Sequence, residues 1–376
     1  MGKSWIKGSI AAGMAVIFIA VFLNIVFDFE QKLENDTKSA VAVTVDSDKG
    51  TAASISSSPC CLPGNPTVTI AAVGDVMMHE GQIWSGYDAS TGKYDYTPFF
   101  HDVKQEISTA DIAIVNMETT LGGRESKFTG YPRFNSPDEL ADALKDAGFD
   151  VIVTSNNHCL DRGEKGALRT RDVLEQKGLS AVGTYRSTDE RDRILIKEIN
   201  GVKIAFLAYT YGTNGNPVPK DKPYLVNLID EDTIIKDLAK ARESADAVVV
   251  YLHFGQEYQR TASERQKELS RMILEKGADV VMGSHPHVIQ PGEWVSVADG
   301  KGSTVEKYVA YSLGNFISAQ RFPHTDEGMI LKIIIEKDLQ SGRIIIKDVK
   351  EIPTWVDKFK KQGKMRYVVK LGKKNV

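Results

Sequence analysis

Five apolar, β-rich runs in this sequence each lead into a side chain that can bind a metal ion. The runs cover residues 67–73, 111–115, 150–154, 247–252 and 279–282, and the polar residues that follow include Asp75, Glu118, Asn157, His253, His285 and His287. Helix-like segments separate the runs, which is typical of an α/β domain with a central sheet. In open α/β sheets, ligands gather outside the carboxyl ends of the strands. We therefore expect these strand ends to converge at one site.

The strongest metal-binding pattern is the run Gly283-Ser-His-Pro-His-Val288, because two imidazoles one residue apart follow a strand. Other interpretations remain open for each residue. The two histidines could be hydrogen-bonded near a strand end, Asp75 and Asn157 could cap a helix or brace a turn, and Glu118 could pair with an arginine. A mixed set of Asp, Glu, Asn and His suits a pair of divalent ions, and Mn, Zn, Fe or Mg would fit it.

The N-terminus has the pattern of a membrane anchor. Lys3 and Lys7 precede a run of uncharged residues from 8 to 27, and acidic residues follow it. An apolar segment of about 20 residues spans a bilayer as a helix, with the lysines on the cytoplasmic side. The alternatives are a cleaved signal peptide, with Ala40-Val-Ala42 as the small-residue site, and a buried soluble helix.

The predicted organisation has five parts along the chain. They are a cytoplasmic N-terminus (1–7), a transmembrane helix (8–28), an extracytoplasmic linker rich in Ser and Pro (29–66), an α/β domain (67–355) and a basic C-terminal tail (356–376). The linker holds Cys60 and Cys61, and an odd count of three cysteines excludes a complete disulfide framework. The protein would be single-pass in the cell membrane, with its main domain outside.

Charge excludes one class of partner and suggests another. A net charge of −3 gives no reason to expect nucleic acid as a partner. The tail, in contrast, carries eight Lys or Arg between residues 357 and 376. It could contact an anionic polymer or lipid headgroups, or it could be a plain solvated tail.

Six motifs together resemble the bacterial capsule-biosynthesis proteins of the CapA or PgsA type, which are associated with poly-γ-glutamate. The motifs are Gly74-Asp75-Val-Met77, Asn116-Met-Glu118, Ser155-Asn-Asn-His-Cys-Leu-Asp-Arg-Gly163, His253-Phe-Gly-Gln-Glu-Tyr258, Gly283-Ser-His-Pro-His-Val288 and Ser312-Leu-Gly-Asn-Phe316. The resemblance implies a calcineurin-like metallophosphoesterase fold, that is, a layered α/β sheet domain.

The resemblance also implies roles for individual residues. Asn157 would bind metal and His158 would act as a general acid or charge stabiliser, while Asp75, His253, His285 and His287 would be metal ligands. Glu118 stands where phosphoesterases usually offer an Asp. Met77 stands two residues after Asp75, where they usually carry a histidine. We therefore expect one metal position to be weaker or differently built.

An anionic substrate needs cationic contacts beside such a site. Arg133 and Arg162 are the predicted substrate-binding residues, with Tyr258, and each arginine could equally form a surface salt bridge. Glu257, predicted to be catalytic, could act as a base, orient His253 or bind an amine. The irregular segments 81–101 and 211–224 could shape the entrance or cover a sheet edge.

These observations predict a membrane-anchored extracytoplasmic component of poly-γ-glutamate capsule synthesis or export. As an enzyme, it would be a metal-dependent hydrolase or transferase acting on an ester or a γ-glutamyl amide bond. The first alternative is a non-catalytic accessory subunit that binds poly-γ-glutamate or another anionic polymer together with membrane synthase subunits. The second is a general metallophosphodiesterase.

Overall fold

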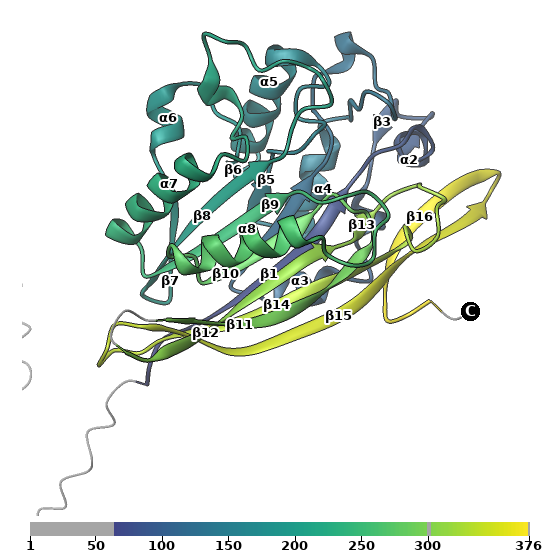
Figure 1. The fold of residues 1–376 in the computed structure, drawn as a ribbon. Coiled ribbons are helices and arrows are strands. Elements are labelled where there is room, and N and C mark those ends of the chain that lie inside the picture. The colour runs from purple at the N-terminus through teal and green to yellow at the C-terminus, as the bar shows by residue number, and fades with distance from the viewer. Residues whose placement is uncertain (1–63, 299–301, 375–376) are drawn as a thin grey trace, which may run out of the picture. The chain divides into compact units, whose positions relative to one another are not determined.

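The computed structural model describes residues 64–298 and 302–374 (Figure 1). Among these residues, no helix combines the length and the apolar character that crossing a membrane requires. The anchor predicted at residues 8–28, most of the linker, and both linker cysteines lie outside the described residues.

Two large sheets form the domain, where the sequence predicted a single central sheet. The first has eight strands, in the order β16-β15-β14-β1-β4-β5-β6, with β13 paired to β1. Its strands are β1 (Thr67–Val76), β4 (Ile112–Met117), β5 (Val151–Val153), β6 (Ser180–Val182), β13 (Asn315–Ile317), β14 (Glu327–Lys337), β15 (Ile344–Lys361) and β16 (Lys364–Leu371). Strands β1, β4, β5 and β6 are parallel, so their carboxyl ends share one edge.

The second sheet has six strands in the order β11-β12-β10-β9-β8-β7. They are β7 (Leu195–Ile199), β8 (Val202–Thr210), β9 (Ala247–His253), β10 (Val280–Ser284), β11 (Ile289–Ala298) and β12 (Thr304–Leu313). Its central strands β8, β9, β10 and β12 are again parallel. A small hairpin, β2 (Tyr87–Asp88) with β3 (Lys93–Tyr94), stands apart from both sheets.

The helices confirm the predicted alternation with strands. They are α2 (Glu80–Ser85), α3 (Lys104–Ser108), α4 (Glu139–Ala147), α5 (Gly163–Gln176), α6 (Thr188–Asp192), α7 (Glu231–Ser244) and α8 (Glu264–Glu275), with the 3₁₀ turns η1 (Thr97–Phe99), η2 (Arg124–Ser126) and η3 (Pro223–Leu225). Helix α8 begins with a capping box in which Ser263 and Gln266 satisfy each other's backbone N–H groups.

The two sheets pack face to face and helices cover their outer faces (Figure 1). Along β1, Ile70 and Ala72 join the core between the sheets, whereas Ala71 and Val73 join the core that includes α3, α4 and α5. Helices α7 and α8 cover the outer face of the second sheet. Strands buried on both faces read as continuous apolar runs, which is why the sequence revealed them.

The prediction of a basic tail is wrong for residues 356–371. These residues complete β15 and form β16, which pair as a hairpin at the edge of the first sheet. Val356, Tyr367 and Val369 are buried in its core, while Lys360, Lys361 and Lys364 between them are exposed. The apolar residues alternate with the charged ones, so a high charge count conceals an amphipathic strand. The domain therefore extends past the predicted boundary at residue 355.

The chain passes from one sheet to the other at Gly314, which lies between β12 and β13. The Asp75 N–H donates to the Gly314 carbonyl at 3.0 Å, and β13 then pairs with the end of β1. A Cβ on Gly74 would lie 1.9 Å from that carbonyl oxygen, so a glycine is required there. This close approach fixes the position of the Asp75 backbone, from which the Asp75 side chain extends.

We predict that Gly74→Ala will destabilise the protein by about 1–3 kcal/mol or more, because the clash is with rigid backbone. Thermal unfolding measures the effect. Gly212→Ala is the matched control, because a Cβ there meets nothing within 4 Å, and its effect should stay within about 0.5 kcal/mol. Equal stability of the two variants would contradict this account of the crossing.

Candidate metal centre

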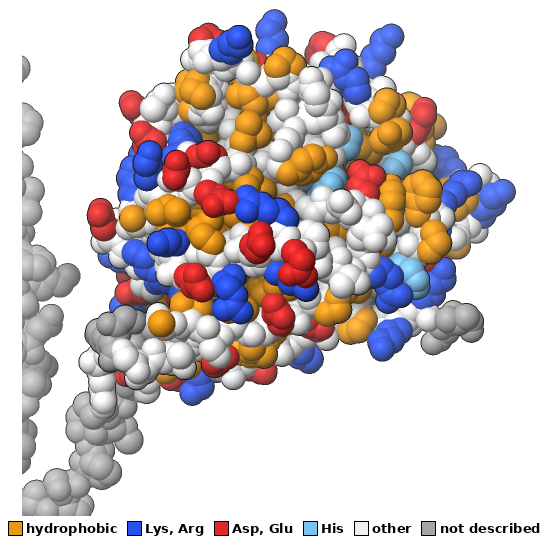
Figure 2. Space-filling view, viewed as in Figure 1, with side chains coloured by type: hydrophobic (Ala, Val, Ile, Leu, Met, Phe, Trp, Pro, Cys, Tyr) orange, Lys and Arg blue, Asp and Glu red, His pale blue; other side chains and the backbone are white. Residues whose placement is uncertain are grey.

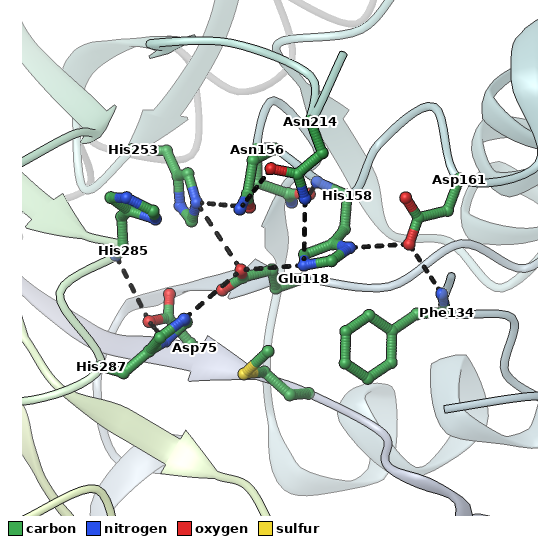
Figure 3. Close-up of polar contacts among 12 residues, drawn as sticks. Asp75, Glu118, Phe134, Asn156, His158, Asp161, Asn214, His253, His285 and His287 are labelled. Atoms are coloured by element: carbon green, nitrogen blue, oxygen red, sulfur yellow. Dashed lines mark hydrogen bonds and ion pairs between the residues drawn. The ribbon is translucent and has the colours of Figure 1, made fainter. Parts of the chain in front are cut away.

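The structure brings the predicted strand ends together at one buried site (Figure 3). Asp75 lies in β1, Glu118 follows β4, His158 follows β5, and His253 ends β9. His285 and His287 follow β10, and all of these side chains are buried, as is Asn157. The sequence prediction that these residues converge is confirmed, and their proposed roles stay predictions.

Glu118 lies at the centre of the cluster. Its Oε1 is 3.7 Å from the Nε2 of His253, 3.9 Å from that of His287 and 4.0 Å from that of His158. Neither carboxylate oxygen has a hydrogen-bond partner among the described residues, and no arginine there pairs with it. Burial raises the pKa of Glu118 well above its ordinary value, and the charge of Asp75 adds to the increase. Such a carboxylate is stabilised by a cation.

Asp75 has the opposite environment because its oxygens are well supplied with donors. Asn116 Nδ2 donates to Oδ1 at 2.7 Å, while His287 Nδ1 lies 3.0 Å from Oδ2. The His285 backbone N–H also approaches Oδ2, at 3.3 Å. Burial alone would raise the pKa of Asp75, but the contacts with His287 and Asn116 bring it below the ordinary value. Asp75 therefore braces the His285 loop in addition to facing the site.

Two of the histidines are held in the neutral form. Burial lowers the pKa of His253 well below its ordinary value, and burial with the charge of His287 lowers that of His285 to about 3. His253 Nδ1 is 2.9 Å from Ser284 Oγ, and its Nε2 is 2.9 Å from Asn157 Oδ1. The buried His285 Nδ1 has no partner among the described residues. Neutral imidazole is the form that binds metal.

The ligand atoms form two overlapping groups. Glu118, His285 and His287 make one group, and Asp75, Glu118 and His253 make the other, with the atoms of each group within 4.8 Å of one another. Glu118 belongs to both. Unpartnered buried oxygens beside neutral imidazole nitrogens are the donor set expected of a divalent metal site, so the residues present fit such an ion.

His158 is held by a carboxylate on its far side. Its Nδ1 lies 2.7 Å from Asp161 Oδ2, and Phe134 packs edge-on against the ring at 4.7 Å between centroids. Asp161 also accepts a hydrogen bond from the Phe134 N–H at 2.6 Å. This fixes the ring so that Nε2 faces Glu118 and the Asn214 amide, which lies 3.3 Å away.

The predicted substrate contacts lie around the site rather than in it. Arg133 is exposed, and its Nε donates to the Asp161 carbonyl at 3.1 Å. Arg162 donates to Thr129 and to the Arg133 carbonyl, so its guanidinium has a structural task. Tyr258 packs against His287 at 6.1 Å between centroids. Glu257 is exposed beside Tyr258, and the nitrogens of His253 are occupied by Ser284 and Asn157 instead.

Several site residues were not anticipated. Asn116 binds Asp75, Ser284 orients His253, and the Tyr211 ring lies 4.5 Å from that of His285. The sequence carries a signal for Asn116, because residues two apart on a strand share a face and Asn116 precedes Glu118 by two residues. Tyr211 and Asn214 come from the segment 211–224, which therefore shapes the site.

Met77 and His79 do not enlarge the ligand set. Met77 is buried, and its backbone N–H donates to the Ile317 carbonyl at 3.0 Å. His79 precedes α2 and packs against Phe134, with 5.2 Å between ring centroids. Burial lowers the pKa of His79 to about 4. These contacts give His79 a packing role.

We predict that Glu118→Gln will stabilise the metal-free protein at neutral pH by about 1–3 kcal/mol, while abolishing stabilisation by added divalent metal. The folded pKa of Glu118 lies above its ordinary value of 4.5. Its contribution to stability is therefore fully present below that value and is lost as pH rises through the folded pKa. The advantage of the glutamine variant should grow with pH.

Thermal unfolding in chelator, then with Mn²⁺ or Zn²⁺, measures both effects. Glu125→Gln is the control, since Glu125 is exposed on η2 just after the same strand. A glutamine variant that is still stabilised by metal as strongly as the wild type would contradict the placement of Glu118 in both ligand groups.

Comparison with known proteins places the chain in a family. Residues 69–320, more than half of the chain, match the family described as "Bacterial capsule synthesis protein PGA_cap". "Capsule biosynthesis protein CapA" of Bacillus anthracis is 29% identical over 281 residues, covering 71% of this chain and 64% of that protein. "PGA biosynthesis protein CapA" of Bacillus subtilis (strain 168) is 34% identical over 202 residues, covering 53% of this chain and 50% of that protein. The chain thus spans less than two thirds of the length of either relative.

Solved structures with a similar fold include the following two. The calcineurin-like phosphoesterase YfkN from Bacillus subtilis has a TM-score of 0.44 at 15% identity, covering 77% of this chain and 90% of that one. The Haemophilus influenzae NAD nucleotidase NadN has a TM-score of 0.47 at 12% identity, covering 77% of this chain and 56% of that one. On the family match, which includes every residue of the metal centre, the chain belongs to the bacterial capsule synthesis proteins of the PGA_cap family.

Proposed function

We propose that this protein is a membrane-anchored, extracytoplasmic component of poly-γ-glutamate capsule synthesis or export that carries a divalent-metal hydrolase site. The observation that carries the proposal is the unpartnered, buried carboxylate of Glu118 among three imidazoles. A buried carboxylate and neutral imidazoles without a cation would be a costly arrangement for a domain that only binds other proteins.

Two divalent ions, drawn from Mn, Zn, Fe or Mg, would be held by the two overlapping ligand groups, with Asn157 beside His253. Such ions lower the pKa of a bound water and polarise the bond under attack. Glu118 would be shared between them. Met77 stands where phosphoesterases usually carry a histidine, so the group around Asp75 would lack the ligand that this histidine supplies, and the two positions would differ in affinity.

The chain's own residues would handle protons and orientation. His158 Nε2 faces the ligand groups, and its contact with Asp161 holds the ring in one orientation, as a general acid requires. Arg133 is exposed close behind His158 and could hold an anionic group of the substrate. These parts suit cleavage or transfer at an ester or a γ-glutamyl amide bond.

The polymer and the location are inferred from the relatives and the sequence. A relative named for PGA biosynthesis supports an anionic polymer as substrate. The uncharged N-terminal run after Lys3 and Lys7 supports an anchor with the domain outside the cell. Membrane synthase subunits would then be the partners.

Met77 is buried at the position where phosphoesterases usually carry a histidine. This difference favours a second candidate, a non-catalytic subunit that holds the polymer and synthase partners. The two candidates make different predictions.

We predict that His158→Ala will lower turnover by about 10²–10⁴-fold with metal retained, and that His285→Ala will lose both metal and turnover. Polymer release from cells and hydrolysis by the purified full-length protein are the measurements.

His101→Ala is the matched control because His101 is exposed and its ring contacts Asp102, which belongs to neither ligand group. Normal polymer production with both site variants, together with loss of production on deleting the anchor, would favour the accessory subunit. Hydrolysis of simple phosphodiesters without any effect on polymer would instead favour a general metallophosphodiesterase.

A further inference from the structure

A cleft opens beside the candidate metal centre, and none of the predicted metal ligands lines it. It has a volume of about 530 Å³ and is lined by the segment between β13 and β14, by Lys358 of β15 and by Lys374 after β16. The lining residues that matter are Arg321, Phe322, His324, Asp326, Lys358 and Lys374. Figure 2 shows Lys and Arg side chains gathering on the side of the molecule that carries the β15–β16 hairpin.

Tyr258 connects this cleft to the metal centre. Its ring lies 4.6 Å from that of Phe322 and 6.1 Å from that of His287, measured between centroids. Its backbone N–H donates to the Pro286 carbonyl at 2.8 Å, between the two histidines of the ligand pair. A molecule seated against Phe322 therefore lies next to the residues that hold His285 and His287.

The acidic residues of the cleft already have partners. Asp326 accepts from Lys374 Nζ at 2.7 Å, and Glu327 lies 3.1 Å from His324 Nδ1. Two cations remain. Lys358 donates to the neutral carbonyl of Gln320 at 2.6 Å, and the exposed Arg321 pairs with no carboxylate in the described part of the chain.

These cations also act on one another. Burial lowers the pKa of Lys358, and the charges of Lys374 and Arg321 lower it further, against the influence of Asp326. An anion bound in the cleft would relieve that repulsion and form charge-assisted hydrogen bonds. The positive charge of the cleft thus favours an anionic ligand.

Cationic side chains therefore stand on two sides of the metal centre. Arg133 lies behind His158, whereas Arg321 and Lys358 lie beyond His287 and Tyr258. A small anion needs one such contact, but a chain with repeated carboxylates makes both at once and gains affinity through its length.

We infer that the cleft of Arg321, Phe322 and Lys358 is a second subsite, which holds the carboxylates of an extended polyanion that crosses the metal centre. Phe322, which is 56% exposed, would pack against the apolar part of that chain. This inference rests on the proposed function, because it assigns the polymer segment beside the reacting bond to a defined surface.

The test measures binding of a long γ-linked glutamate oligomer and of glutarate, a small dicarboxylate, to the full-length protein loaded with Mn²⁺. Arg321→Ala should weaken binding of the long oligomer by about tenfold and leave glutarate binding and metal content unchanged. Lys358→Gln should act in the same direction. Arg271→Ala and Lys347→Ala are matched controls, because these exposed cations lie on α8 and on the distant part of β15.

Unchanged oligomer binding in both cleft variants would overturn the subsite while leaving the proposed function intact. An equal loss of oligomer and glutarate binding would overturn the idea of a chain crossing the centre, because the cleft would then hold any small anion. A wild-type protein that binds metal but no oligomer of any length would instead contradict the polymer assigned under the proposed function.

Discussion

The arrangement of this site depends on one buried carboxylate that has no hydrogen-bond partner among the described residues. Moving a carboxylate out of water costs several kcal/mol unless donors or a cation compensate. Glu118 lacks hydrogen-bond donors in the described part of the chain, although Asp75 beside it has three. The depressed pKa of His253 means that this neighbouring ring supplies no charge of its own. The surrounding residues therefore fit a cation beside Glu118.

Backbone strain accompanies this electrostatic constraint. His285, His287 and Tyr258 have φ values of 99°, 59° and 65°, in the left-handed region that L-residues seldom adopt. Each such residue costs on the order of 1–3 kcal/mol and persists where the surroundings hold it. Here the holding contacts are those from the His285 N–H to Asp75 and from the Tyr258 N–H to Pro286. The strain lies in the loop that carries the ligand pair, which supports a functional reason for it.

The predictable part of this molecule is the part that local pattern determines. Strands β1, β4, β5, β9 and β10 are buried on both faces, so their apolar runs and polar ends were visible in the sequence. Their division between two sheets was not, because it depends on the long-range pairing of β13 with β1 after Gly314. The β15–β16 hairpin was concealed by its charge, and Tyr211 reaches His285 along an irregular path that has no periodic signal.

The position of His158 bears on whether the site performs chemistry or only holds a ligand. A buried imidazole needs a hydrogen-bond acceptor for its N–H group, and a carboxylate in that position also fixes the orientation of the ring. His158 has such a carboxylate in Asp161, and Asp161 is itself held by the Phe134 N–H. These contacts direct His158 Nε2 toward the ligand groups, and a general acid or a charge stabiliser would have to lie in this position. The exposed Arg133 is tied to the same loop through the Asp161 carbonyl, so anion binding and proton transfer would share one support. A single loop that supports both groups is easier to explain for a catalyst than for a subunit that only binds the polymer.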